Sequence, residues 1–128
     1  MSLPKNIKDF RISVVGELSE ERYEGDFSCV CVPPIGLKNK IDRDELRETG
    51  DLSNIGMELF MRSKWLSNVQ NRLLTWPEWW DGCRKGVALL DDNVLKEIYD
   101  KCVEAEAEWR QSIKKQTPAV TTPAVPPV

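Results

Sequence analysis

The first regular pattern along the chain is an alternation of apolar and polar positions close to the amino terminus. Phe10, Ile12 and Val14 alternate with Arg11 and Ser13, which is the period-two pattern of a half-buried strand. A second run of this kind follows in the sequence, from Tyr23 to Cys31. Together the two runs predict a β-hairpin, which needs helices or further strands beneath it because two strands alone are marginally stable. The apolar face of the second run is formed by Tyr23, Phe27, Cys29 and Cys31.

The middle of the chain carries the three- and four-residue spacing of an amphipathic helix. This spacing predicts a long helix from Asp51 to Leu74, which ends before Trp76-Pro77 because a proline pushes the preceding residue out of the α region. A shorter helix is expected at residues 42–47. The apolar repeat of the long helix also permits self-association, so a homo-oligomer is one expectation. The repeat is formed by Leu52, Ile55, Leu59, Leu66, Val69 and Leu73.

A second long helix is predicted in the carboxy-terminal third of the chain. We expect it to begin at Asp91 or Asp92, because either carboxylate can accept from the free N–H groups of the first turn and favours the positive helix end. It should end near Lys114 and Lys115, whose charges suit the negative end. Its apolar stripe is formed by Val94, Leu95, Ile98, Tyr99, Cys102, Val103, Ala105 and Trp109.

Strands followed by helices are the element order of an α+β domain. The chain has 128 residues, a length that suits one domain. We therefore expect one α+β domain at residues 1–115, in which the hairpin packs on a mainly helical unit with two long helices. Residues 116–128 contain many prolines and no charged residue. They are expected to form a disordered, Pro/Thr/Val-rich flexible tail or linker.

Charge and composition argue against two classes of partner. Eighteen Lys and Arg residues against 21 Asp and Glu residues give a net charge of -3, which is unfavourable for binding that depends on neutralising phosphates. No apolar run approaches the roughly 18 residues of a membrane span. We therefore expect neither nucleic acid nor a membrane as a partner. Protein partners are the expectation that is left.

The chain contains no histidine, which excludes Ser-His-Asp and Cys-His nucleophile arrangements and every histidine-containing metal site. It also has no phosphate-binding loop. Cys29 and Cys31 share a strand face but lie too far apart for an easy disulfide, so we expect buried free thiols in a reducing cytoplasm. The chain is therefore predicted not to be an enzyme, with no catalytic residue, cofactor or metal; a small hydrolase or transferase is the least favoured class.

Three of the five tryptophans lie within the short segment Trp76-Pro-Glu-Trp79-Trp80. One interpretation is an aromatic anchor for a protein partner, since tryptophan dominates interface hot spots. The other is that the rings cover the core where the two long helices meet. Three tryptophans so close together cannot all point the same way, so we expect one ring to be exposed.

Four short motifs together resemble the small tail assembly chaperones of long-tailed, siphovirus-like bacteriophages. They are Tyr23-Glu-Gly-Asp-Phe27, a proline-led segment with Ile35 and Ile41, Trp76-Pro-Glu-Trp-Trp80, and Leu90-Asp-Asp-Asn-Val94. The resemblance extends over roughly residues 10–112. The cysteine pair in the hairpin departs from the family pattern. The Pro/Thr/Val tail would suit a linker to a longer frameshifted form, as in such phages.

The resemblance implies a non-enzymatic role in the cytoplasm of the host cell. Such a chaperone binds the tape-measure protein and helps to recruit tail-tube subunits before the tube polymerises. An apolar groove for an amphipathic helix is then expected. The residues expected to line it are Met57, Met61, Trp65 and one of Trp76, Trp79 and Trp80.

A competing interpretation is a structural component of the virion, such as a head, connector or tail accessory protein. Its hairpin would add to the sheet edge of a neighbour and its tail would lie along another subunit. The sequence alone does not separate this interpretation from the chaperone.

Overall fold

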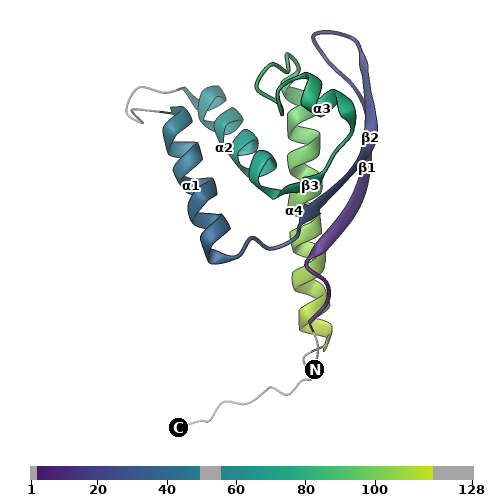
Figure 1. Ribbon diagram of the computed structural model, residues 1–128, viewed down its shortest axis with the longest axis vertical. Helices are drawn as coiled ribbons and strands as arrows, with labels where there is room; N and C mark the ends of the chain where they lie inside the picture. Colours follow the sequence, from purple (N-terminus) through teal and green to yellow (C-terminus); the bar gives the residue numbers. More distant parts are fainter. Residues whose placement is uncertain (1–2, 50–55, 117–128) are drawn as a thin grey trace.

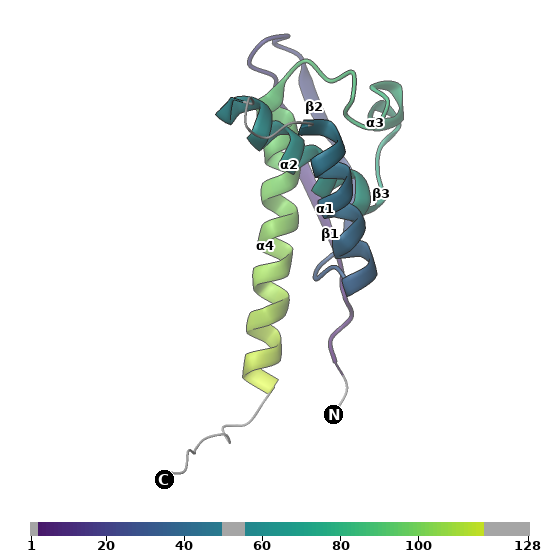
Figure 2. The same cartoon turned by 90° about the vertical axis from the view of Figure 1, so that its left-hand side faces the viewer.

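The computed structural model describes residues 3–49 and 56–116 and confirms the α+β class (Figure 1). The strands form one antiparallel sheet in the order β1-β2-β3. Helix α4 packs against the hairpin, α2 packs against α4, and α1 packs on α2 at the far side of the molecule (Figures 1 and 2). In chain order, the elements are β1 (Ile7–Val15), β2 (Arg22–Val30), α1 (Ile35–Thr49), α2 (Met57–Arg72), β3 (Leu73–Thr75), α3 (Glu78–Gly82) and α4 (Asp92–Gln116).

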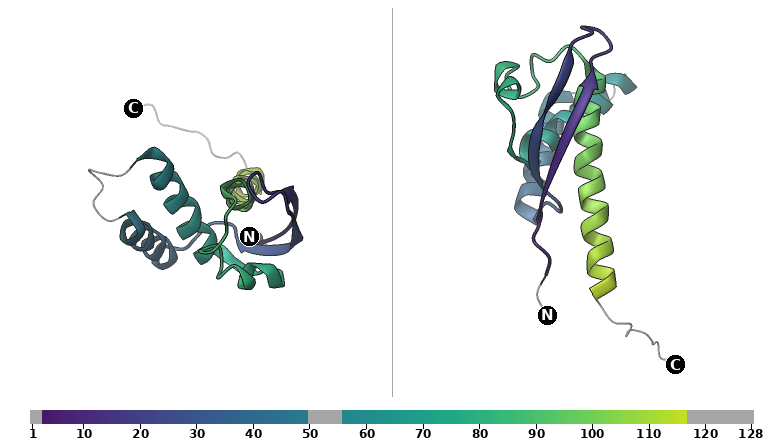
Figure 3. Two further views of the ribbon diagram at one scale, coloured as in Figure 1. Left: turned by 90° about the horizontal axis from the view of Figure 1, so that it is seen from above. Right: turned by 90° about the vertical axis from the view of Figure 1, so that its right-hand side faces the viewer.

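The hairpin and the last helix follow the sequence prediction closely. β1 and β2 pair in a continuous antiparallel register from Ile7↔Val30 to Val15↔Arg22, and α4 begins at Asp92. The hairpin curves beside α4, as the view from above shows (Figure 3). The predicted tail lies outside the described residues, apart from Gln116 at the end of α4.

The central helices differ from the prediction in their bounds. α1 is a 15-residue helix rather than a short helix at 42–47, and i,i+4 ion pairs such as Lys38–Asp42 support its exposed side. The predicted helix 51–74 has its described part at Met57–Arg72, and residues 51–55 lie outside the described residues.

This helix ends two residues early because Leu73–Thr75 forms β3, which pairs with Ser28 and Cys29 of β2. The Ser28 and Thr75 hydroxyls share a hydrogen bond of 2.7 Å. Tertiary pairing therefore overrides the helical spacing that continues through Leu73.

The core fills the space between the sheet, α2, α3 and α4. Phe27 stacks on Phe10 with ring centroids 5.3 Å apart and meets Trp80 edge to face. Each such side chain contributes roughly 1.5–3 kcal/mol through burial. The largest fully buried apolar side chains of this core are Phe27, Cys29, Val69, Trp80, Val94, Ile98 and Cys102.

One charged side chain, Arg72, is buried where three elements meet, with only 3% of its surface exposed. Its guanidinium donates to the carbonyls of Val30 and Cys31 at the end of β2 and to that of Cys102 on α4. It also lies 3.4 Å from the carboxylate of Glu106. A single side chain at the end of α2 therefore satisfies carbonyls of β2 and α4 and holds the three elements together.

We expect Arg72→Met to lower the free energy of unfolding by about 3 kcal/mol, because it leaves buried carbonyls without a donor. The matched control is Arg110→Met, which removes the other arginine bound to Glu106 but from an exposed position, and should cost about 0.5 kcal/mol. Urea denaturation followed by circular dichroism measures both. Equal losses of unfolding free energy in the two variants would show that the buried Arg72 stabilises the fold no more than the exposed Arg110 does.

Candidate binding cleft

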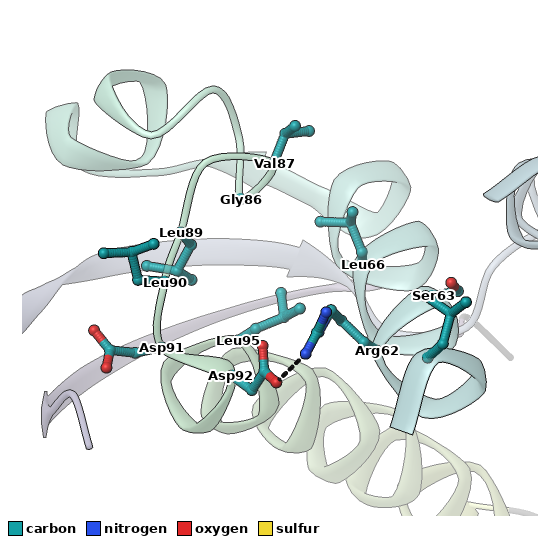
Figure 4. Close-up of a pocket in the computed structure, with 11 residues that line it drawn as sticks. Arg62, Ser63, Leu66, Gly86, Val87, Leu89, Leu90, Asp91, Asp92 and Leu95 are labelled. Carbon is teal, nitrogen blue, oxygen red and sulfur yellow. Dashed lines mark hydrogen bonds and ion pairs between the residues drawn. The ribbon is translucent and has the colours of Figure 1, made fainter. Parts of the chain in front are cut away.

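A cleft of about 410 Å³ lies between the first half of α2, residues 86–92 and the first turn of α4. Leu66 and Leu95 point into it from α2 and α4, and the segment that carries Val87 and Leu90 forms its other wall (Figure 4). We call it the aliphatic cleft. Its apolar lining is formed by Leu59, Leu66, Val87, Leu89, Leu90 and Leu95.

The wall formed by residues 86–92 depends on an unusual backbone turn. Arg84, Lys85 and Gly86 all have positive φ angles, of 58°, 54° and 93°. Gly86 packs so closely that a Cβ atom there would lie 2.7 Å from the Trp80 ring and 2.9 Å from Leu66. The Lys85 carbonyl accepts a 2.8 Å hydrogen bond from the side chain of Gln70 on α2. The wall is therefore fixed to the α2 helix and to the core.

The rim of the cleft leaves aliphatic side chains in contact with water. Leu59 is 42% exposed, Val87 60% and Leu90 67%. Scattered exposed aliphatic residues are ordinary on a protein surface, but several around one concave site are typical of an interaction surface.

An ion pair crosses the cleft and joins its two helices. Arg62 on α2 lies 2.7 Å from the carboxylate of Asp92 at the start of α4 (Figure 4). Both side chains are about half exposed, so the pair contributes little to stability, about 0–1 kcal/mol. Its effect is to place a paired charge between the aliphatic walls of the cleft.

Asp91 fastens the hairpin turn to one end of the cleft. Its carboxylate accepts from the N–H groups of Leu18 and Ser19 at 2.6 and 3.0 Å and from the Ser19 hydroxyl at 2.6 Å. A Cβ atom at Gly16 would lie 2.3 Å from this carboxylate, so the turn can approach only because that residue is glycine. Glu17 and Leu18 are thereby brought to a smaller depression next to the cleft, which shares Leu90 and Asp92 with it.

Asp91 therefore has a different role from the one predicted for it. We expected a carboxylate at 91 or 92 to accept from the first N–H groups of the helix. The backbone carbonyl of Asp91 accepts from Val94 and Leu95 instead, and its side chain is committed to the hairpin turn. The Ser19 hydroxyl, with the N–H groups of Ser19 and Leu18, holds the pKa of the Asp91 carboxyl below its usual value.

Three of the predicted partner-binding residues lie on a different face of α2 from the cleft lining. Met57, Met61 and Trp65 are spaced four residues apart, so they share one face, and none of them lines the cleft. Met57 is 73% exposed. Met61 and Trp65 are half-buried, and Trp65 packs against Tyr99 of α4 with ring centroids 6.5 Å apart. Contact of a partner with these three residues stays a prediction.

The predicted tryptophans divide between the core and its edge, and none of the three is exposed. Trp80 is 1% exposed and belongs to the core. Trp79 is half-buried, donates its indole N–H to the carbonyl of Glu24 at 2.8 Å and packs edge-on against Tyr23. Trp76 is half-buried beneath Lys85, whose Nζ lies 4.9 Å from the ring centroid. The rings thus cover the core and the edge of β2, so Trp80 is not available to a partner, and contact with Trp76 or Trp79 stays a prediction.

The lining residues that sequence analysis missed come mainly from one segment. Val87-Ala-Leu-Leu90 is an apolar run between the two predicted long helices, and such a run outside any periodic element is the signal that could have identified the wall. Leu59 and Leu66 were assigned to the apolar stripe of a buried helix, whereas they line the open cleft.

Three of the four cysteines lie in the core. Cys29, Cys31 and Cys102 are buried, as predicted for the first two, and all four thiols are free. A hydrogen bond with Cys29 and burial both raise the pKa of the Cys102 thiol, whereas the same hydrogen bond lowers the pKa of the Cys29 thiol. Among residues 3–49 and 56–116, no group of three or more Cys, Asp or Glu side chains could hold a metal ion.

We expect Asp91→Asn to lower the melting temperature most at neutral pH. Because the folded-state pKa lies below the unfolded value of about 3.9, the stability that the carboxylate contributes is present above about pH 5 and is lost as the pH falls through the folded pKa. Thermal melts from pH 2.5 to 7 should show the wild-type and variant curves converging in acid. Asp26→Asn, at an exposed position, is the control, and a constant Asp91→Asn difference at every pH would contradict the assignment.

We expect Gly86→Ala to lower the free energy of unfolding by about 2 kcal/mol, because alanine disfavours a positive φ and its Cβ would overlap Trp80 and Leu66. Gly82→Ala is the control, since a Cβ there meets nothing within 4 Å. Chemical denaturation of the two variants measures the change in the free energy of unfolding. Similar changes in both variants would show that the turn at residue 86 tolerates a side chain.

The chain was compared with protein-family models, curated proteins and solved structures, and none of them matches it. None of the helices in the described ranges has the length and apolar character needed to cross a membrane.

Proposed function

We propose that this protein is a non-enzymatic tail assembly chaperone of a long-tailed bacteriophage. In this role it holds an amphipathic helix of the tape-measure protein in the aliphatic cleft and helps to recruit tail-tube subunits in the host cytoplasm. The observation that carries the proposal is the ring of exposed aliphatic side chains around a concave site built by α2 and residues 86–92. The motifs that resemble the chaperone family support it independently.

The cleft has the features that recognition of a helix requires. Leu59 and Leu66 are seven residues apart on α2, so they present two aliphatic contacts about two turns apart along one wall. The segment that carries Val87 and Leu90 forms the opposite wall (Figure 4). A helix with apolar residues at positions i, i+3, i+4 and i+7 could place this stripe between the two walls.

Recognition of this kind also suits the chemistry of an assembly chaperone. Aliphatic contacts are non-directional, so they tolerate successive apolar stripes of a long helical partner. The walls are fixed to the core by Gly86 and Gln70, so the chaperone itself does not have to fold on binding, which reduces the entropic cost.

The alternative role as a virion component has one favourable observation of its own. Backbone bonds from Gly16 N–H to Glu21 and from Cys31 N–H to Asn6 place the even-numbered residues of β1 in the bonded pairs. The odd-numbered residues of β1 therefore turn their N–H and C=O groups away from β2. Within the described sheet they have no strand partner, so a strand from a neighbouring subunit could pair there.

Co-expression with candidate tape-measure and tail-tube proteins tests the proposal. We expect a soluble complex with the tape-measure protein, and we expect Leu90→Asp to reduce its recovery at least tenfold, because a charge would enter the apolar contact. Leu3→Asp is a matched control, since both leucines are 67% exposed but Leu3 lies in the amino-terminal segment, away from the cleft residues. Met57→Asp reports separately on the surface that the sequence predicted.

Three outcomes separate the candidate roles. Loss of the complex with Leu90→Asp, while Leu3→Asp binds normally and both variants show native circular dichroism, supports the chaperone and its cleft. If all variants bind the tape-measure protein equally, the cleft is not its binding site. Absence of binding, together with a fixed number of copies in purified virions, would establish the virion component instead.

A further inference from the structure

The aliphatic cleft is bordered by carboxylates, and the basic side chain among its lining residues is already paired. Glu17, Asp91 and Asp92 are the acidic residues that line the cleft and the adjoining depression, against Arg62 as the basic one. Asp91 is buried and committed to the hairpin turn. Asp92 is bound to Arg62 at 2.7 Å. The remaining charge among these lining residues is therefore negative.

A further carboxylate extends this acidic rim along α2. Glu58 is exposed and lies one helical turn before Arg62, whose pKa it helps to raise together with Asp92. Within the described residues, neither Glu17 nor Glu58 forms a side-chain ion pair. Glu17 therefore adds a carboxylate without an ion pair to the adjoining depression, and Glu58 adds a second carboxylate beside Arg62, next to the lining residue Leu59.

The hairpin turn adds to the same charge. Glu20 and Glu21 follow Leu18 in the turn and are exposed, and the turn is held in place by Asp91. Leu18 itself is 70% exposed and lies beside Leu90 in the adjoining depression. An occupant that extends from the cleft toward this turn passes from aliphatic walls to carboxylates.

We propose that the occupant of the aliphatic cleft is a cationic amphipathic helix, with an apolar stripe between the walls and Lys or Arg side chains flanking this stripe. The inference rests on the proposed function and adds the charge of the partner. Charges at the rim act mainly on association rate, specificity and salt dependence, whereas the apolar stripe supplies most of the affinity. An acidic helix with the same stripe would face Glu17 and Glu58 and bind more weakly.

Two synthetic 18-residue peptides test the charge of the occupant. Both carry the same leucine stripe at positions i, i+3, i+4 and i+7, and their flanking positions are Lys in one and Glu in the other. We expect the Lys peptide to bind the full chain about tenfold more tightly at 50 mM salt, with the difference shrinking above about 0.5 M salt as screening increases. Isothermal titration calorimetry measures both affinities.

Charge-reversal variants test which carboxylates cause the preference for the Lys peptide. Glu17→Lys with Glu58→Lys should reverse or abolish the preference for the Lys peptide. The control pair Glu104→Lys with Glu108→Lys changes the net charge equally, at exposed positions on the second half of α4, and should leave the preference largely intact. The salt titration of the unmodified chain provides the test if the first variant does not fold.

Failure of this inference can be distinguished from failure of the proposed function. If both peptides bind equally and Leu90→Asp weakens the binding of both, the cleft is a binding site but the proposed preference for a positively charged helix is wrong. If neither peptide binds, or Leu90→Asp affects neither, both proposals are wrong at this site. Dimerisation that Leu90→Asp abolishes would assign the cleft to a second copy of the chain and also overturn the inference.

Discussion

The buried guanidinium of Arg72 is the contact on which the arrangement of the secondary structure depends. A buried charge is tolerated only when its hydrogen-bonding groups are satisfied. Arg72 meets this requirement with carbonyls from the end of β2 and from α4, and with Glu106. Because Arg72 is the last residue of α2, the position of that helix is fixed relative to both elements. The chain then continues directly into β3, which extends the sheet. No buried side-chain nitrogen or oxygen of the described residues lacks a partner.

The cleft follows from this arrangement. Arg72 anchors the carboxy-terminal end of α2, and the start of the helix borders the cleft beside α4, where the Arg62–Asp92 pair bridges them. The space between the helices is filled on one side by Gly86 and Trp80 and remains open at Val87 and Leu90. Asp91 brings the hairpin turn to the same end of α4. A polar network thus holds the elements in position, while aliphatic side chains of the cleft remain exposed to solvent.

The sequence predicted those parts of the fold that local patterns determine. Alternation identified the hairpin, and capping residues with a long apolar stripe placed α4 almost to the residue. The change from helix to strand after Arg72 was missed, because Leu73 fits the helical repeat equally well and only its pairing with β2 decides. Two properties were misread for the same reason. One ring of the tryptophan cluster was expected to be exposed, but Trp80 is core and Trp76 and Trp79 are half-buried. The aliphatic run at 87–90 was assigned no role, but it forms a wall of the cleft. Whether such residues face the core or the solvent depends on contacts between segments far apart in the chain.

The charged side chains that line the cleft are engaged within the protein. Asp91 binds the hairpin turn, Asp92 binds Arg62, and the buried thiols lie elsewhere in the core. What remains unsatisfied is aliphatic surface, and burial against another apolar surface is the interaction that satisfies it. The walls are fixed, Asp91 is buried, and Asp92 is paired with Arg62 across the cleft. Under the proposals made above, a partner would be selected by its apolar stripe and by its charge.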